Sequence, residues 1–138
     1  MRLKNIHGRL QSKNVTKYLI DWRKNSRSKL QTRAKRFFQK YWKEHIVYEE
    51  FPVYGTRMKV DLLNATKKVA IEVNGPQHST FNSFFHKNSR LNYLKSIKRD
   101  YIKAQWLEAN GYELIELSTE EVDNLSEDFL VKNMKKLI

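Results

Sequence analysis

The chain has 138 residues, 40% of them hydrophobic and 12% aromatic, which is enough to bury the core of one domain. It contains no cysteine, which excludes disulfides, thiolate metal sites and cysteine nucleophiles. No apolar run approaches the length of a membrane span, and the basic start lacks the apolar stretch of a secretory signal. These features predict a cytoplasmic protein with no membrane partner.

Positive charge is concentrated in the first third of the chain. The net charge is +12, and residues 1–45 carry 14 lysines and arginines against Asp21 and Glu44, whereas the remainder is balanced. Such a one-sided basic segment is typical of proteins that bind a polyanion, although a solvated basic face would look the same. We expect contacts with the phosphates of double-stranded DNA. The side chains expected to make them are Arg2, Lys4, Arg9, Lys13, Arg23, Lys24, Arg27, Arg33 and Arg36.

The N-terminal part predicts an arm followed by two helices. Residues 1–12 have the composition of an irregular basic arm, and apolar positions at helical spacing predict a short helix from Val15 to about Lys24. Ser28 is suited to cap a second helix. That helix should turn its apolar positions inward: Leu30, Ala34, Phe37, Phe38, Tyr41 and Trp42.

Three β-rich runs follow at residues 45–51, 58–63 and 69–73, and they predict an antiparallel meander. If the second hairpin places Asp61 opposite Glu72, its apolar residues also face one another across the strands. A shift of one residue would separate the two acids. The pattern therefore predicts one apolar side of the sheet and one side that carries both carboxylates.

The second half of the chain predicts a loop, a helix, a strand and a final helical region. Residues 74–89 read as a long loop, and helical periodicity extends from about residue 90 to 110. Residues 112–117 predict a strand, after which Ser118 and Glu121 form a capping-box pattern.

The order of elements predicts an α/β or α+β fold with a small mixed sheet flanked by helices. We divide the chain into a basic arm with a short helix, residues 1–27, and a main domain, residues 28–138.

Asp61 and Glu72 are the leading candidates for chemistry, although two acids on a sheet can also be solvated surface residues. Hydrolysis of a phosphodiester needs a divalent ion held by hard oxygen ligands. The two carboxylates and the carbonyl of Val73 could hold Mg²⁺ or Mn²⁺. Gln77 and His78 follow the strand and could orient water or protonate the leaving oxygen.

The residues of this region resemble the restriction-endonuclease-like PD-(D/E)xK superfamily, and most of all its Vsr-like branch with the EDxHD phage homing endonucleases. The resemblance extends from about Ser28 to Leu117 and implies a magnesium-dependent DNA endonuclease of phage or mobile-element type, located in a bacterial or phage-infected cell. It implies that Asp61 and Glu72 are metal ligands. The matching residues are Glu50, Asp61, Glu72, Asn74, Gly75, Gln77, His78, Asp100, Lys103, Leu107, Gly111 and Tyr112.

The chain departs from the family pattern at three positions. Asn74 stands where the superfamily has its lysine, so Gln77, His78 or a lysine elsewhere must take that role. Val60 replaces the proline before the first acid, and Lys29 stands near the place of a glutamate on the first helix. This leaves Glu50, or less favourably Glu49, as the additional catalytic acid.

Residues 79–90 are basic and polar with three phenylalanines, and we expect them to lie in a loop. Its aromatic rings could wedge between base pairs or stack on an unpaired base; packing onto the core or a dimer partner is an equal alternative. The side chains expected to contact DNA here are Phe81, Phe84, Phe85, Lys87 and Arg90.

Other functions remain compatible with this sequence. A structure-specific nuclease such as a Holliday-junction resolvase would use the same chemistry. A non-catalytic nucleic-acid-binding module would need only the basic first third, and an assembly protein could retain a decayed nuclease fold. Cleavage of both DNA strands requires two active sites, so a monomer would nick DNA unless it forms a homodimer.

Overall fold

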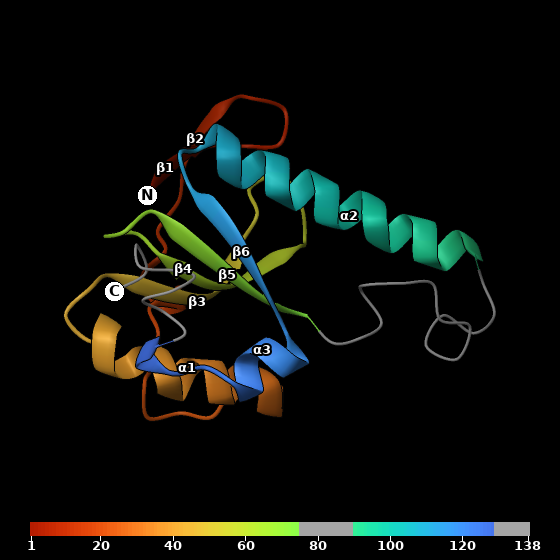
Figure 1. The fold of residues 1–138 in the computed structure, drawn as a ribbon. Coiled ribbons are helices and arrows are strands. Elements are labelled where there is room, and N and C mark those ends of the chain that lie inside the picture. The colour runs from red at the N-terminus through yellow and green to blue at the C-terminus, as the bar shows by residue number, and fades with distance from the viewer. Residues whose placement is uncertain (75–89, 129–138) are drawn as a thin grey trace.

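A four-stranded mixed sheet lies between helices on both of its faces (Figure 1). The computed structural model describes residues 1–74 and 90–128. The sheet has the order β3-β4-β5-β6, and a two-stranded sheet pairs β1 with β2. The elements are β1 (Arg2–Lys4), β2 (Leu10–Ser12), a 3₁₀ turn (Thr16–Tyr18), α1 (Lys29–Trp42), β3 (Val47–Pro52), β4 (Lys59–Asn64), β5 (Val69–Asn74), α2 (Arg90–Ala109), β6 (Glu113–Ser118) and α3 (Thr119–Asp123).

The predicted class of mixed α and β structure is confirmed, as are the three meander strands and the helix that Ser28 caps. The Ser28 side chain accepts a hydrogen bond from the amide of Gln31, which satisfies one free donor of the first turn. Ser118 and Glu121 form the predicted capping box at the start of α3. Figure 1 shows α1 and α3 on one face of the sheet and α2 on the other.

The register of the hairpin between β4 and β5 is the predicted one. β3, β4 and β5 pair antiparallel, with Leu62 opposite Ile71, and β6 joins β5 in parallel through the α2 crossover. The expectation of one apolar and one polar side is wrong, because helices cover both faces. Leu62 and Ile71 pack toward α1, whereas Leu63 and Ala70 belong to the apolar cluster that contains Trp106 of α2.

The N-terminal residues are more ordered than the sequence predicts. Instead of an irregular arm, residues 2–12 form the β1–β2 hairpin, and the predicted helix after Val15 is only the 3₁₀ turn. Leu3 is buried in the core cluster that also contains Trp106. The Trp106 indole donates a hydrogen bond of 2.6 Å to the carbonyl of Lys4, which holds the hairpin against α2.

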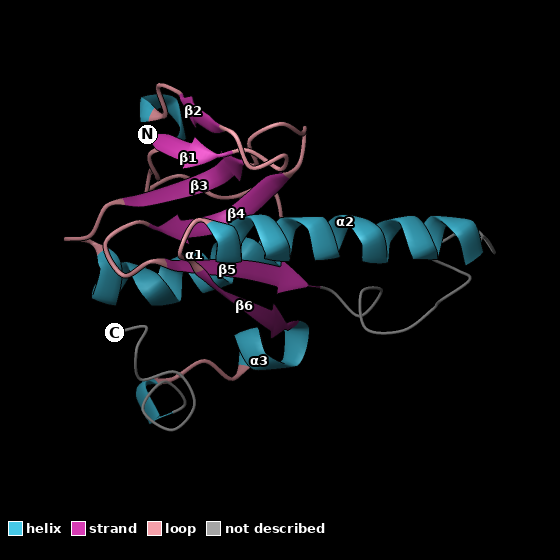
Figure 2. Cartoon of the chain, turned by 90° about the horizontal axis from the view of Figure 1, so that it is seen from above, coloured by secondary structure: helices cyan, strands magenta, loops and turns pink. Residues whose placement is uncertain are grey.

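The first half of α2 extends beyond the sheet (Figures 1 and 2). A helix of 20 residues spans about 30 Å, whereas strands of six residues span about 20 Å. Leu94, Ile97 and Tyr101 follow helical spacing but are exposed as a result. Periodicity therefore predicts this helix correctly, while only its C-terminal part is covered by the core.

No helix in residues 1–74 and 90–128 combines the length and apolar character required to cross a lipid bilayer.

Candidate functional site

Asp61 and Glu72 lie side by side where the ladder between β4 and β5 ends. The Leu62–Ile71 pair is the last backbone pair in this direction. Beyond it, the carboxylates replace the carbonyl acceptors of the ladder. The amide of Asp61 donates to Oε2 of Glu72 at 3.0 Å, and the amide of Val73 donates to Oδ2 of Asp61 at 2.8 Å. The predicted juxtaposition of the two acids is confirmed.

Lys103 of α2 completes the cluster. Its ammonium group forms an ion pair with Oε1 of Glu72. The lysine side chain is 14% exposed and that of Glu72 is 9% exposed, so the contact is largely shielded from water. Within the described part of the chain, one lysine therefore faces two acids, and the cluster has one more carboxyl group than it has cations.

This imbalance changes the acidity of the pair. The pKa of Asp61 is raised to about 8, first by burial and then by the neighbouring charge of Glu72. The amide of Val73 and the charge of Lys103 lower it without compensating. Near neutral pH the two carboxyl groups therefore retain a proton, which a bound cation would displace.

The donor set of the cluster fits a magnesium ion. Within residues 1–74 and 90–128, no group of three or more Asp, Glu and His side chains is arranged to hold a metal. Magnesium is commonly bound through only one or two carboxylates, together with water and substrate phosphates. Asp61 and Glu72 match that pattern, and the Val73 carbonyl stays the predicted third ligand.

The carboxylate of Glu50 does not lie with those of Asp61 and Glu72. Glu50 lies opposite Asp61 in the β3–β4 register, between the paired residues Glu49 and Phe51. Its backbone has φ of 53°, a conformation uncommon outside glycine. The Glu50 carboxylate accepts a hydrogen bond of 3.2 Å from Gln31 of α1, on the opposite face of the sheet from Lys103.

A second acid–lysine cluster occupies that α1 face. Lys35 is 1% exposed and pairs with Glu49 at 2.8 Å. The Glu49 carboxylate also accepts hydrogen bonds from Ser26 and Gln31. Burial alone would raise the pKa of Glu49, but these three donors together hold it below its usual range.

The predicted nucleic-acid contacts of the N-terminal part are all exposed at the surface. Three of them also make side-chain contacts within the chain. The ammonium group of Lys13 lies 4.9 Å from the centre of the Tyr54 ring. Arg33 forms an ion pair with Asp123 of α3, and Arg36 binds the carbonyl groups of Trp22 and Arg23. The other six side chains are Arg2, Lys4, Arg9, Arg23, Lys24 and Arg27.

Several predicted site residues lie outside the described part of the chain. They are Gln77, His78, Phe81, Phe84, Phe85 and Lys87, together with the side chain of Arg90.

Lys103 could be predicted only as part of the family pattern, and Lys35 was not predicted at all. A signal for Lys35 is its spacing, because Gln31, Lys35, Phe38 and Trp42 lie at i, i+4, i+7 and i+11 and are all buried. For Lys103 no local signal exists, since its partner Glu72 is 31 residues away.

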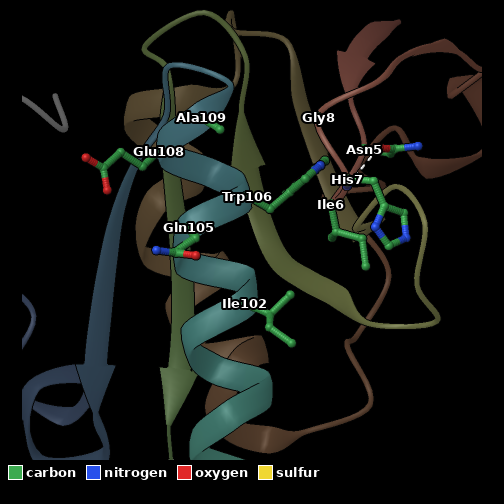
Figure 3. Close-up of a pocket in the computed structure, with 9 residues that line it drawn as sticks. All are labelled: Asn5, Ile6, His7, Gly8, Ile102, Gln105, Trp106, Glu108 and Ala109. Carbon is green, nitrogen blue, oxygen red and sulfur yellow. Dashed lines mark hydrogen bonds between the residues drawn. The ribbon is translucent and has the colours of Figure 1, made fainter.

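A cavity of about 720 Å³ lies away from the acid pair, between the turn of the β1–β2 hairpin and the C-terminal part of α2. Figure 3 shows Ile6, Ile102 and Trp106 at the gap between turn and helix, while Gln105 and Glu108 point away from the turn. Binding sites combine an apolar lining with polar groups that converge. This cavity does not bring its polar side chains together, so it is a weaker candidate than the acid pair.

No family model matches the chain, and no solved structure matches it. The chain is similar to uncharacterized protein 033L of Invertebrate iridescent virus 3, with 36% identity over 66 residues. The match covers 48% of this chain and 34% of the viral protein, so the chain spans about a third of the length of this curated relative. The name of this relative states no activity, and the case for a function therefore depends on the site itself.

Proposed function

We propose that the protein is a metal-dependent endonuclease that hydrolyses phosphodiester bonds in double-stranded DNA, with a restriction-endonuclease-like site. The observation that carries the proposal is the shielded pair of Asp61 and Glu72, which Lys103 alone compensates among the residues that the structure describes. Two carboxylates in contact are unfavourable by themselves, and a divalent cation relieves their repulsion. The exposed basic side chains of the first 36 residues support a polyanionic substrate.

Each residue of the cluster has a separate role in this proposal. Asp61 and Glu72, helped by the Val73 carbonyl, would hold Mg²⁺, which supplies charge neutralisation and a more acidic attacking water. Lys103 keeps Glu72 oriented and presents a positive charge to the transferring phosphoryl group. It would thus provide the lysine that is missing at Asn74. Gln77 and His78 remain the proposed groups for orienting water or protonating the leaving oxygen.

The test is cleavage of supercoiled plasmid at low salt with Mg²⁺, with Mn²⁺ and with EDTA. Wild type should nick or linearise the plasmid in a metal-dependent manner. Asp61→Asn and Glu72→Gln keep the shape of the side chains but remove a ligand charge, and should lower the rate by at least about 10³-fold. Glu44→Gln is the matched control, because Glu44 is an exposed acid beyond the end of α1.

The outcomes separate the alternatives. Loss of cleavage in both variants but not in the control supports the site. A nicked product would indicate one active site, and a linear product would indicate two. If plasmid is untouched, four-way junctions and mismatched duplexes test a structure-specific nuclease. If none of these is cut while DNA binding is unaffected by the substitutions, the protein is a nucleic-acid-binding module and the nuclease proposal is wrong.

A further inference from the structure

A second, smaller cavity of about 250 Å³ lies directly beside the acid pair. It is formed where the start of β4 meets the middle of α2. Lys103 belongs to both sites, because it lines the cavity and its ammonium group contacts Glu72. The lining residues are Met58, Lys59, Ser96, Arg99, Asp100 and Lys103.

We propose that this cavity binds a backbone phosphate of the DNA strand that is cleaved. The bound phosphate is the neighbour of the one at which cleavage occurs. The proposal rests on the nuclease function proposed above and adds the path of the substrate strand. Neither Lys59 nor Arg99 belongs to the set of side chains predicted from the sequence to contact DNA.

The charges of the lining favour an anion. The lining holds three cations, Lys59, Arg99 and Lys103, and one acid, Asp100. Because Lys103 is already paired with Glu72, an excess of one positive charge remains. Lys59 approaches from the strand, whereas Arg99 and Lys103 are on consecutive turns of the helix. In residues 1–73 and 94–128, neither Lys59 nor Arg99 forms an ion pair with an acid. Lysine and the planar fork of arginine are the usual partners of phosphate.

The size and position of the cavity favour a phosphodiester over a larger ligand. Pockets for drug-sized molecules usually measure about 300–1,000 Å³, so this volume suits a compact group. Successive phosphates of one DNA strand are about 3.4 Å apart along the helix axis. Lys103 lines this cavity and also contacts Glu72. A phosphate bound in the cavity would therefore place the next phosphate of the same strand close to Glu72.

The test measures binding without cleavage. Fluorescence anisotropy of a labelled duplex in EDTA gives the affinity at several salt concentrations for wild type, Lys59→Gln, Arg99→Gln and the double variant. Each substitution should weaken binding several-fold and reduce the slope of log K against log salt by about 0.9, the value for one duplex phosphate contact. Lys67→Gln is the matched control, because Lys67 is exposed in the turn at the other end of β4 and carries the same charge.

The results distinguish this proposal from the nuclease proposal. If the Lys59 and Arg99 variants behave like Lys67→Gln, the phosphate subsite is wrong, even if wild type cleaves DNA. If their slopes fall as expected but no substrate is cut, the subsite stands and the nuclease function is wrong. A wild-type protein that binds no DNA overturns both.

One further experiment distinguishes a site for a DNA phosphate from a site for free inorganic phosphate. Inorganic phosphate is added in place of chloride at constant ionic strength, and melting of the wild type is compared with that of the double variant. The proposal predicts equal melting temperatures in both anions. Stabilisation of the wild type alone would show a site for free phosphate and overturn the assignment to DNA.

Discussion

Two acid–lysine clusters lie on opposite faces of the same sheet, and they differ in how completely their charges are compensated. On the α1 face, Glu49 receives hydrogen bonds from Lys35, Ser26 and Gln31, and its pKa is lowered. On the α2 face, Asp61 and Glu72 share Lys103, and the pKa of Asp61 is raised. A compensated acid stabilises the fold, whereas an excess of carboxylate is what a cation-binding site requires.

The largest predicted effect is on the compensated cluster. Lys35→Met would leave the Glu49 carboxylate shielded from water without its cation, which should lower the free energy of unfolding by about 3–5 kcal/mol. Urea denaturation measures this, with the exposed Lys43→Met as a control that should change stability by less than about 0.5 kcal/mol. Equal stability of the two variants would remove the distinction drawn between the clusters.

The second prediction concerns how the stability of the fold depends on pH. It uses the cluster on the α2 face, in which Asp61 and Glu72 share Lys103. The pKa of Asp61 is about 8 in the folded chain against an ordinary value of 3.8, so between these values the folded state binds more protons than the unfolded state. Without metal, stability should therefore fall as pH rises from about 4 to 8, by an amount on the order of a few kcal/mol, and level off above.

Urea denaturation in EDTA at pH 5, 6.5 and 8 measures that trend, which Asp61→Asn should flatten and Glu44→Gln should preserve. Mg²⁺ should stabilise the wild type more at pH 8 than at pH 5, because the metal competes with the retained proton. Wild-type stability that does not change between pH 5 and 8 would contradict the raised pKa.

A third prediction tests the lysine of the uncompensated cluster as part of the chemistry. Lys103→Met should reduce the cleavage rate about 100-fold, as removal of one stabilising donor to a developing anion does, while Lys35→Met should leave the rate of the folded fraction unchanged. Single-turnover cleavage at saturating protein measures both. A Lys103 variant with wild-type rate would make this lysine a structural partner of Glu72 only.

The smallest predicted effect is at Gln31, which donates to both Glu49 and Glu50. Gln31→Leu should cost about 1.5 kcal/mol of stability, since hydrogen bonds to charged groups are lost. Because Glu50 lies on the α1 face, the cleavage rate should not change. A large loss of rate in folded Gln31→Leu would return Glu50 to the active site, as the family resemblance implies.

Much of this arrangement could be predicted from local patterns. Alternation of apolar residues fixes the β4–β5 register, and with it the contact between Asp61 and Glu72. Residues whose placement depends on distant partners could not be predicted. The burial of Lys35 depends on its ion pair with Glu49 in the sheet. The orientation of Glu50 depends on a backbone conformation with positive φ, which cannot be predicted from a glutamate in the sequence.

The N-terminal hairpin was not predicted for the same reason. Strands of three residues carry almost no periodic signal, and the hairpin is held by Trp106 and Asn110 rather than by its own sequence.

The attachment of this hairpin has a consequence for folding. Lys4 is bound by Trp106 and Asn110, more than 100 positions further along the chain. Contacts between such distant positions are slow to form, because a long loop must close first. During synthesis, the hairpin therefore leaves the ribosome more than 100 positions before Trp106 and Asn110, and it cannot bind them until they have also emerged. The β1–β2 hairpin is thus expected to be among the last parts of the domain to reach its final position.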